Sequence, residues 1–241
     1  MRMTSSLAFI ALLAAASPAA QAHDITAKSD PKVPPAFDIV KATATTDGRL
    51  ATFIMEVTGK AGSAKPEKLG RLEGSKVDAY VWPTNLDPSA AGFAKESGIL
   101  ALAITAHPDF DDTPLFDENR DGDPGNDGAD WHSHWVVLAA DKACAGGLKV
   151  RDVSPGQDVL PKTAPGLPIA LDSPGMSPIL KGASVKITVP VEGAENVSFD
   201  ALAAKLQVHE QGKTPLLCVT GTYKVASGNL SLPGAIVRKD N

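Results

Sequence analysis

Short runs in which apolar and polar residues alternate recur along most of the chain. A period of two is typical of strands that bury one face. The clearest pair flanks Asp47-Gly48, a dipeptide that favours a tight hairpin turn. The pattern predicts strands over residues 37–45, 49–57, 76–82, 98–107, 131–139, 148–153, 183–191 and 216–225.

Helical periodicity is weak. The best case is 198–206, where Ser198 is placed to cap a short alanine-rich helix. The segment 154–178 contains six prolines and three glycines, so we expect it to cover the surface without regular structure. About eight strands at this spacing favour an antiparallel β-sandwich of the Ig-like or Greek-key kind. A barrel is the alternative, and either would carry long irregular loops and little helix.

The N-terminal segment has the three parts of a secretory signal peptide. Arg2 supplies the positive charge, residues 7–16 form an apolar run, and Ala20-Gln21-Ala22 is a small-residue cleavage motif. The apolar run is too short to span a bilayer, and no later run is longer. We therefore expect residues 1–22 to be removed after Ala22. Residues 23–241 would then be a single β-rich domain in the periplasm or outside the cell.

The sequence contains two cysteines, Cys144 and Cys218. In an oxidising compartment such a pair predicts a disulfide. The bridge would close a loop of about 75 residues and contribute about 4 kcal/mol in the chain-entropy model. The alternative is a pair of free buried thiols. Bridged cysteines are not available as metal ligands or nucleophiles.

The negative charge of the chain is concentrated in one segment. The formal net charge is −5, with no basic stripe, which argues against a nucleic-acid partner. Residues 109–130 hold nine acidic residues and one basic residue, Arg120. Most of the acids are aspartates separated by glycines, a composition that suits a tight loop around a hard cation. A plain solvated acidic turn is the alternative.

The centre of this loop has the spacing of a calcium-binding sequence. Asp117, Asn119 and Asp121 occupy alternate positions and Gly122 follows at the sharp turn, which resembles the opening of EF-hand-type loops, including those of dockerin-like modules. The usual glutamate at position 12 is replaced by Gly128. The resemblance implies a structural Ca²⁺ held by Asp117, Asn119, Asp121, Asp123, Asp127 and Asp130.

His132 and His134 flank Ser133 in a predicted strand. Residues i and i+2 share one face of a strand, so both imidazoles point the same way. The pair resembles the paired metal-binding histidines of α-carbonic anhydrases and cupins. The alternative is that both are ordinary residues of a half-buried strand.

Three other histidines are candidates for the same site. His107 lies on the strand face of Ala101, Ala103 and Thr105, and His209 lies opposite Val208. If their strands neighbour the histidine pair, three imidazoles would form a zinc or copper site, with Asp109, Asp130 or Glu210 as a fourth ligand or hydrogen-bond acceptor.

The third candidate depends on cleavage of the signal peptide. Cleavage after Ala22 would make His23 the N-terminal residue. This resembles the histidine brace of lytic polysaccharide monooxygenases and CopC-like periplasmic copper proteins. The resemblance implies that His23 is a copper ligand.

Three functions follow from these patterns. The favoured one is an exported metal-binding protein that handles copper or zinc; methionines are too few for a copper(I) shuttle. The second is a calcium-stabilised module that binds a protein or glycan, which exposed Tyr80 and Trp82 would support; the alternative is that both pack in the core. The third is a zinc- or copper-dependent enzyme with Glu210 or Asp109 as base. No other catalytic motif is present, so the sequence favours a protein that is not an enzyme.

Overall fold

The computed structural model describes residues 24–112, 117–154, 156, 158–210 and 216–239. Within these ranges the helical structure consists of two short 3₁₀ turns, Pro88–Ala91 and Asp127–Ala129. The strands are β1 Ile25–Thr26, β2 Ile39–Thr46, β3 Leu50–Val57, β4 Lys76–Pro83, β5 Ile99–Ala106, β6 His132–Ala140, β7 Leu148–Val150, β8 Leu171–Asp172, β9 Ile179–Lys181, β10 Ser184–Pro190, β11 Ser198–Phe199, β12 Leu202–Val208, β13 Leu217–Val225, β14 Gly234–Ala235 and β15 Val237–Arg238. The predicted mainly-β class is confirmed.

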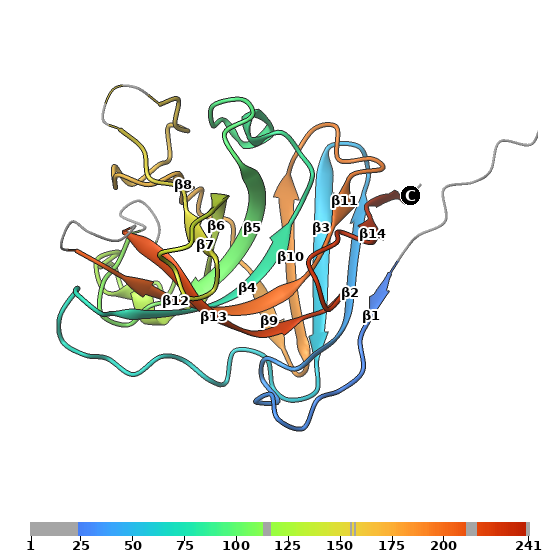
Figure 1. The fold of residues 1–241 in the computed structure, drawn as a ribbon, viewed down its shortest axis with the longest axis horizontal. Helices are drawn as coiled ribbons and strands as arrows, with labels where there is room; N and C mark the ends of the chain where they lie inside the picture. The colour runs from blue at the N-terminus through green and yellow to red at the C-terminus, as the bar shows by residue number, and fades with distance from the viewer. Residues whose placement is uncertain (1–23, 113–116, 155, 157, 211–215, 240–241) are drawn as a thin grey trace, which may run out of the picture.

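Six strands close into an antiparallel barrel in the order β5-β4-β12-β13-β7-β6, and β6 returns to pair with β5. β8 pairs with β6 beside β7, at Trp135 and Val136. The barrel forms the left half of the molecule in Figure 1. The barrel that the sequence left as an alternative therefore describes one of the two main sheets.

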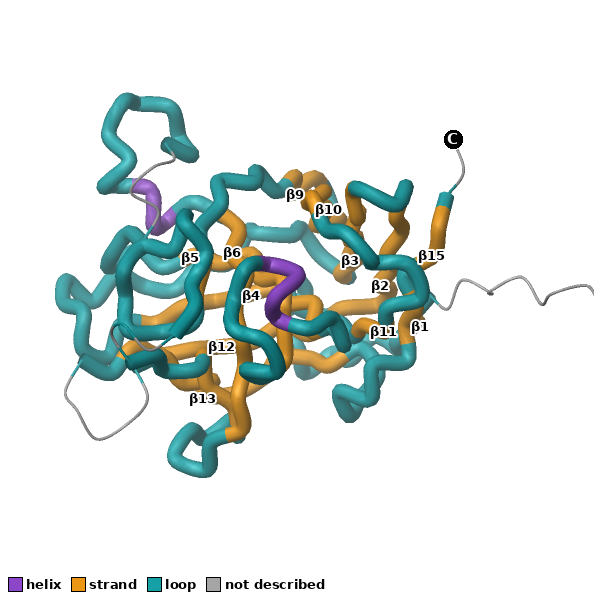
Figure 2. The backbone as a smooth tube through the Cα atoms, turned by 90° about the horizontal axis from the view of Figure 1, so that it is seen from above, coloured by secondary structure: helices purple, strands orange, loops and turns teal. Residues whose placement is uncertain are grey.

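The other main sheet is open and has the order β1-β2-β3-β10-β9, with β15 parallel to β2. It lies beside the barrel, as both views show (Figures 1 and 2). Phe53 of this sheet packs on Trp82 of the barrel, with ring centroids 5.9 Å apart. The layered arrangement expected of a sandwich is thus present, but one layer is a closed barrel.

Strands β4, β5 and β6 are buried on both faces. Leu100, Leu102 and Ile104 face the open sheet and belong to the core between the two layers. Ala101 and Ala103 face the barrel interior, where they join a separate apolar core. The predicted division of this strand into two faces is confirmed, and the face that carries His107 is the inner one.

The predicted helix at 198–206 is wrong. Residues 202–208 form β12, which pairs with both β4 and β13. Alternate residues Leu202, Ala204 and Leu206 point into the barrel core. Small alanines fit the narrow interior, and pairing on two edges outweighs their helical preference.

The structure also tests the predicted hairpin, disulfide and Pro/Gly-rich segment. Asp47 caps its hairpin by accepting backbone hydrogen bonds from Arg49 and Leu50, and Gly48 has φ 95°. Cys144 and Cys218 form the predicted disulfide. The expectation that segment 154–178 has no regular structure is wrong at one place, because the segment contains the short buried strand β8. Among the described residues, no helix is long and apolar enough to cross a membrane.

Candidate metal centre

Two neighbouring barrel strands bring three histidines to the same end of the barrel. In the β5–β6 pair, Thr105 lies opposite His132 and Ala103 lies opposite His134. His107 follows the last residue of β5. The alternation that puts His132 and His134 on one face also puts Ser133 on the other, where its hydroxyl bonds to the carbonyl of Met176.

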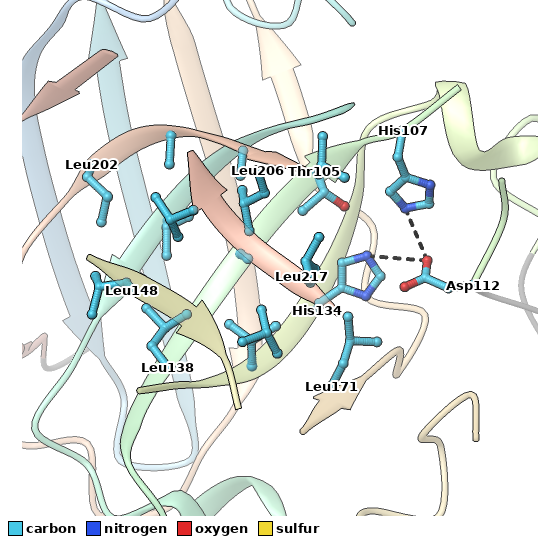
Figure 3. Close-up of a pocket in the computed structure, with 18 of the residues that line it drawn as sticks. Thr105, His107, Asp112, His134, Leu138, Leu148, Leu171, Leu202, Leu206 and Leu217 are labelled. Atoms are coloured by element: carbon cyan, nitrogen blue, oxygen red, sulfur yellow. Dashed lines mark ion pairs between the residues drawn. The ribbon is translucent and has the colours of Figure 1, made fainter. Parts of the chain in front are cut away.

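The fourth member of the cluster is Asp112, from the loop that follows β5. Its Oδ1 lies 3.1 Å from His107 Nε2, 3.6 Å from His132 Nε2 and 3.7 Å from His134 Nε2. One donor atom from each of the four residues lies within 4.8 Å of the others. Figure 3 shows Asp112 between His107 and His134 at the mouth of the barrel. All four side chains are buried.

The outer ring nitrogens have defined partners. His107 Nδ1 lies 2.7 Å from the carbonyl oxygen of Phe110, and His132 Nδ1 lies 2.7 Å from that of Asp130. A carbonyl oxygen only accepts hydrogen bonds, so each Nδ1 carries a proton. In the neutral rings both Nε2 atoms therefore have free lone pairs.

The third ring is held in a similar way. His134 Nδ1 lies 3.0 Å from Ser173 Oγ, whose own proton is donated to the backbone carbonyl of Asp112 at 3.3 Å. The hydroxyl is thus an acceptor for the His134 Nδ1 proton, which leaves His134 Nε2 unprotonated. An outer hydrogen bond of this kind fixes the ring and the tautomer of a metal-binding histidine.

With these tautomers, the Nε2 atoms and Asp112 Oδ1 at the centre of the cluster are acceptors without donors. His107 Nε2 and His132 Nε2 are only 2.8 Å apart, so that two lone pairs face each other when both rings are neutral. Asp112 Oδ1 and His134 Nε2 have no hydrogen-bond partner in the described part of the chain. Buried acceptors that face one another are costly unless a proton or a metal cation lies between them. The donor set therefore fits a bound metal ion.

The electrostatics hold His134 and Asp112 in their metal-binding forms and favour a proton on His107, with which an ion would compete. Burial lowers the pKa of His134 to about 3, against the attraction of Asp112, so this ring is neutral near pH 7. Burial opposes ionisation of Asp112, but His134 and His107 outweigh it and hold the pKa of Asp112 well below its usual range. Burial lowers the pKa of His107, but the charge of Asp112 outweighs it and the net shift is upward.

The acidic loop, residues 109–130, holds the cluster in place. It supplies Asp112 and the two carbonyls that orient His107 and His132. The backbone carbonyl of Gly128 accepts a hydrogen bond from the amide of His107 at 2.5 Å. A Cβ on Gly128 would lie 1.8 Å from the carbonyl oxygen of Phe110, so only glycine fits this approach.

Of the histidines predicted from sequence, the structure brings His107, His132 and His134 together. His209 lies apart, with its Nδ1 3.7 Å from Glu73 Oε1. His23 and the predicted signal peptide lie outside the described residues. Sequence reasoning missed Asp112, because nothing distinguishes it from the other eight acids of its loop.

The acids proposed as a fourth ligand have other partners. Asp109 Oδ1 accepts hydrogen bonds from the amides of Leu69 and Gly70. Asp130 Oδ1 pairs with Lys65 at 3.2 Å, and only its backbone carbonyl reaches a histidine. Glu210 follows His209, away from the cluster, and its amide bonds to Glu73.

The predicted calcium residues bind the backbone of their own loop. Asp117 accepts hydrogen bonds from the amides of Asp121 and Gly122, and buried Asp127 accepts them from Glu118 and Asn119. Burial and the nearby charges of Asp127 and Asp111 raise the pKa of Glu118 to about 7. Among the described residues, the histidine cluster is the one group of three or more His, Cys, Asp or Glu side chains close enough to hold an ion. Calcium binding stays a prediction.

A small cavity of about 50 Å³ adjoins the cluster on the inside of the barrel. His107, Asp112, His134 and Thr105 border it at one end, and aliphatic side chains line the rest (Figure 3). The chain matches no protein-family model, no curated protein and no solved structure.

Proposed function

We propose that the protein is an exported metal-binding protein that holds a Zn²⁺ or Cu²⁺ ion between His107, Asp112, His132 and His134. One observation carries the proposal. The Nδ1 partners of His107 and His132 direct two lone pairs at each other across 2.8 Å, beside an ionised carboxylate. A divalent cation relieves that repulsion between the neutral rings, and it would displace the proton that Asp112 favours on His107.

The donor chemistry supports these two metals. Imidazole nitrogens with one carboxylate oxygen suit Zn²⁺ and Cu²⁺. Copper(I) prefers thiolate and thioether donors. Both cysteines are in the disulfide, and Met55 lies in the core between the two sheets. The cluster has no sulfur donor within it.

Burial supports one role within metal handling. All four donors lie below the surface, so an ion enters or leaves only when the surrounding side chains move. This favours slow exchange and sequestration over rapid delivery to a partner. The glycan-binding alternative loses its support in the sequence, because Tyr80 and Trp82 are fully buried.

Elemental analysis of protein exported with its own N-terminal segment, and purified without chelators, tests the proposal. We expect about one equivalent of zinc or copper, and loss of this metal in the variant His132→Ala/His134→Ala. His209→Ala is the matched control, because it removes a histidine outside the cluster and should retain the metal. Metal-free wild-type protein, even after incubation with each ion, would overturn the proposal.

Export and calcium binding are separate parts of the proposal. Arg2, the apolar run 7–16 and the disulfide support export, and N-terminal sequencing of the processed protein should begin at His23. The spacing of Asp117, Asn119 and Asp121 supports a structural Ca²⁺. Calcium measured in the same elemental analysis, and absent from Asp117→Ala/Asp121→Ala, is the expected result; no calcium in the wild type would contradict it.

A further inference from the structure

The cavity beside the centre contains polar atoms that the metal site does not explain. Thr105 is buried, with an exposed fraction of 7 %. Its Oγ1 has no hydrogen-bond partner in the described part of the chain. Asp112 Oδ1 and His134 Nε2 are also unpartnered and border the same cavity. An ion accounts for the last two atoms. The hydroxyl of Thr105 is left as a donor for something else in the cavity.

The rest of the cavity wall is aliphatic. Ala103, Val136 and Leu138 come from β5 and β6, and Leu202, Leu206 and Leu217 come from β12 and β13 (Figure 3). Such a wall solvates no charge and favours an alkyl group. The occupant therefore has a polar end toward the cluster and an apolar end toward the barrel axis.

Charge selects the polar end. A divalent ion with neutral imidazoles and the Asp112 carboxylate has a net charge of +1. Asp112 and the histidines supply every ionisable side chain on the cavity wall. A monoanionic head bound to the ion would bring the buried charge to zero, which is favourable in a low-dielectric interior.

Size limits the apolar end. About 10–15 Å³ of cavity volume holds one water molecule, so the cavity of about 50 Å³ holds roughly three to five non-hydrogen atoms. Acetate has four non-hydrogen atoms and propionate has five. A second hollow of about 160 Å³ shares Phe110, Asp112, Leu171 and Leu217 with the first.

We propose that the barrel cavity is a binding site for a short-chain monocarboxylate. The carboxylate enters the coordination shell of the ion and accepts a hydrogen bond from the Thr105 hydroxyl, and the alkyl end lies among the aliphatic side chains. This inference rests on the proposed metal centre. It adds a ligand class and assigns Thr105 as a positioning residue.

Cobalt-loaded protein provides a direct test, because the visible spectrum of Co²⁺ changes when an anion enters its coordination shell. Metal content is measured first, and the protein is then titrated with acetate, propionate and hexanoate. We expect spectral changes with acetate and propionate. Propionate should bind about fourfold more tightly because it buries one more methylene group. Hexanoate is too long for the cavity and should give no saturable change.

Three variants separate the parts of the site. Thr105→Val keeps the side-chain shape and removes the hydroxyl, and should weaken propionate binding by about tenfold or more. Ala103→Leu fills the cavity opposite His134 and should abolish propionate binding. Both variants should keep one equivalent of metal. Thr188→Val, on the open sheet, is the control and should bind propionate as the wild type does.

The outcomes distinguish the two proposals. Protein that holds one equivalent of metal but gives no saturable response to acetate or propionate would overturn the ligand site and leave the metal centre standing. Hexanoate binding as tight as propionate would also overturn it, since the closed cavity could not be the site. Failure to bind cobalt, zinc or copper would overturn both.

Discussion

At the scale of single residues, the centre depends on side chains that hold the histidines from behind. Ser173 is the acceptor for His134 Nδ1 and touches no metal donor atom. Loss of such a partner usually weakens metal affinity by about 10–100-fold. We therefore expect this loss in Ser173→Ala, measured by competition with a chromophoric chelator. Ser133→Ala removes a buried hydroxyl from the other face of β6 and should leave affinity unchanged; equal losses in both variants would contradict the assignment.

Gly128 is a second residue whose role is set by contact. A Cβ there would meet the backbone of Phe110 and His107, which cannot move without shifting Asp112 and the His107 ring. We expect Gly128→Ala to lower metal occupancy and to cost about 1–3 kcal/mol of folding free energy. Gly125 lies in the same loop, where an added Cβ meets only the Asp123 side chain at 3.2 Å. Gly125→Ala should retain the metal, and an equal loss in both variants would point to general loop damage.

The sequence could predict the pairing of His132 with His134 because strand geometry fixes which residues share a face. The same argument placed His107 on the face of Ala101, Ala103 and Thr105, which the structure shows to be the inner one. Asp112 could not be predicted, because its position depends on how an irregular loop turns back over the barrel. Nor could the isolation of His209, which depends on its contact with Glu73.

At the scale of elements, Asp38 ties the N-terminal segment to β13. Its buried carboxylate pairs with Lys224 at 2.6 Å and accepts hydrogen bonds from Ser29 and the amide of Asp30. Burial raises the pKa of Asp38, but these bonds outweigh it and the net shift is downward. A lowered pKa means that this stabilisation is complete above the unfolded-state pKa and is lost as pH falls through the folded-state value.

Asp38→Asn should therefore lower the free energy of unfolding by about 2 kcal/mol near neutral pH. The difference from wild type should shrink in acid, where the wild-type carboxyl is also neutral. Urea unfolding between neutral pH and pH values near the carboxyl pKa measures this. Asp24→Asn, in the exposed pair with Lys41, is the control and should have little effect at any pH. A difference that grows in acid would show that the sign is wrong.

Most strands could be predicted because their alternation survives in the structure. β12 was missed because Ala203 and Ala204 have high helix propensity, whereas its strand conformation depends on pairing along both edges with β4 and β13. The sequence of 202–208 does not indicate which strands will pair with it. For the same reason the buried strand β8 is hidden within a segment rich in proline and glycine.

At the scale of the whole molecule, the sequence could not decide between a sandwich and a barrel. Closure depends on β7, a three-residue strand that meets β13 at a single residue pair, Lys149 with Cys218. So short a strand carries little signal of its own. The disulfide between Cys144 and Cys218 lies beside this β7–β13 pairing. It links β13 covalently to the segment that precedes β7, and few backbone hydrogen bonds connect these two strands.

Two constraints therefore close the barrel, the disulfide at the β7–β13 seam and the proposed ion at the β5–β6 end. Cys144→Ala/Cys218→Ala should lower the free energy of unfolding by about 4 kcal/mol. Removing the metal should cost about 4 kcal/mol when the free ion is held a thousandfold above its Kd. Neither cysteine lines the cavity or belongs to the cluster, so the two losses should add. Denaturant unfolding of the wild type and the variant, each with and without metal, measures all four states. If the variant no longer binds metal, the two ends of the barrel are coupled and the expectation of additivity is wrong.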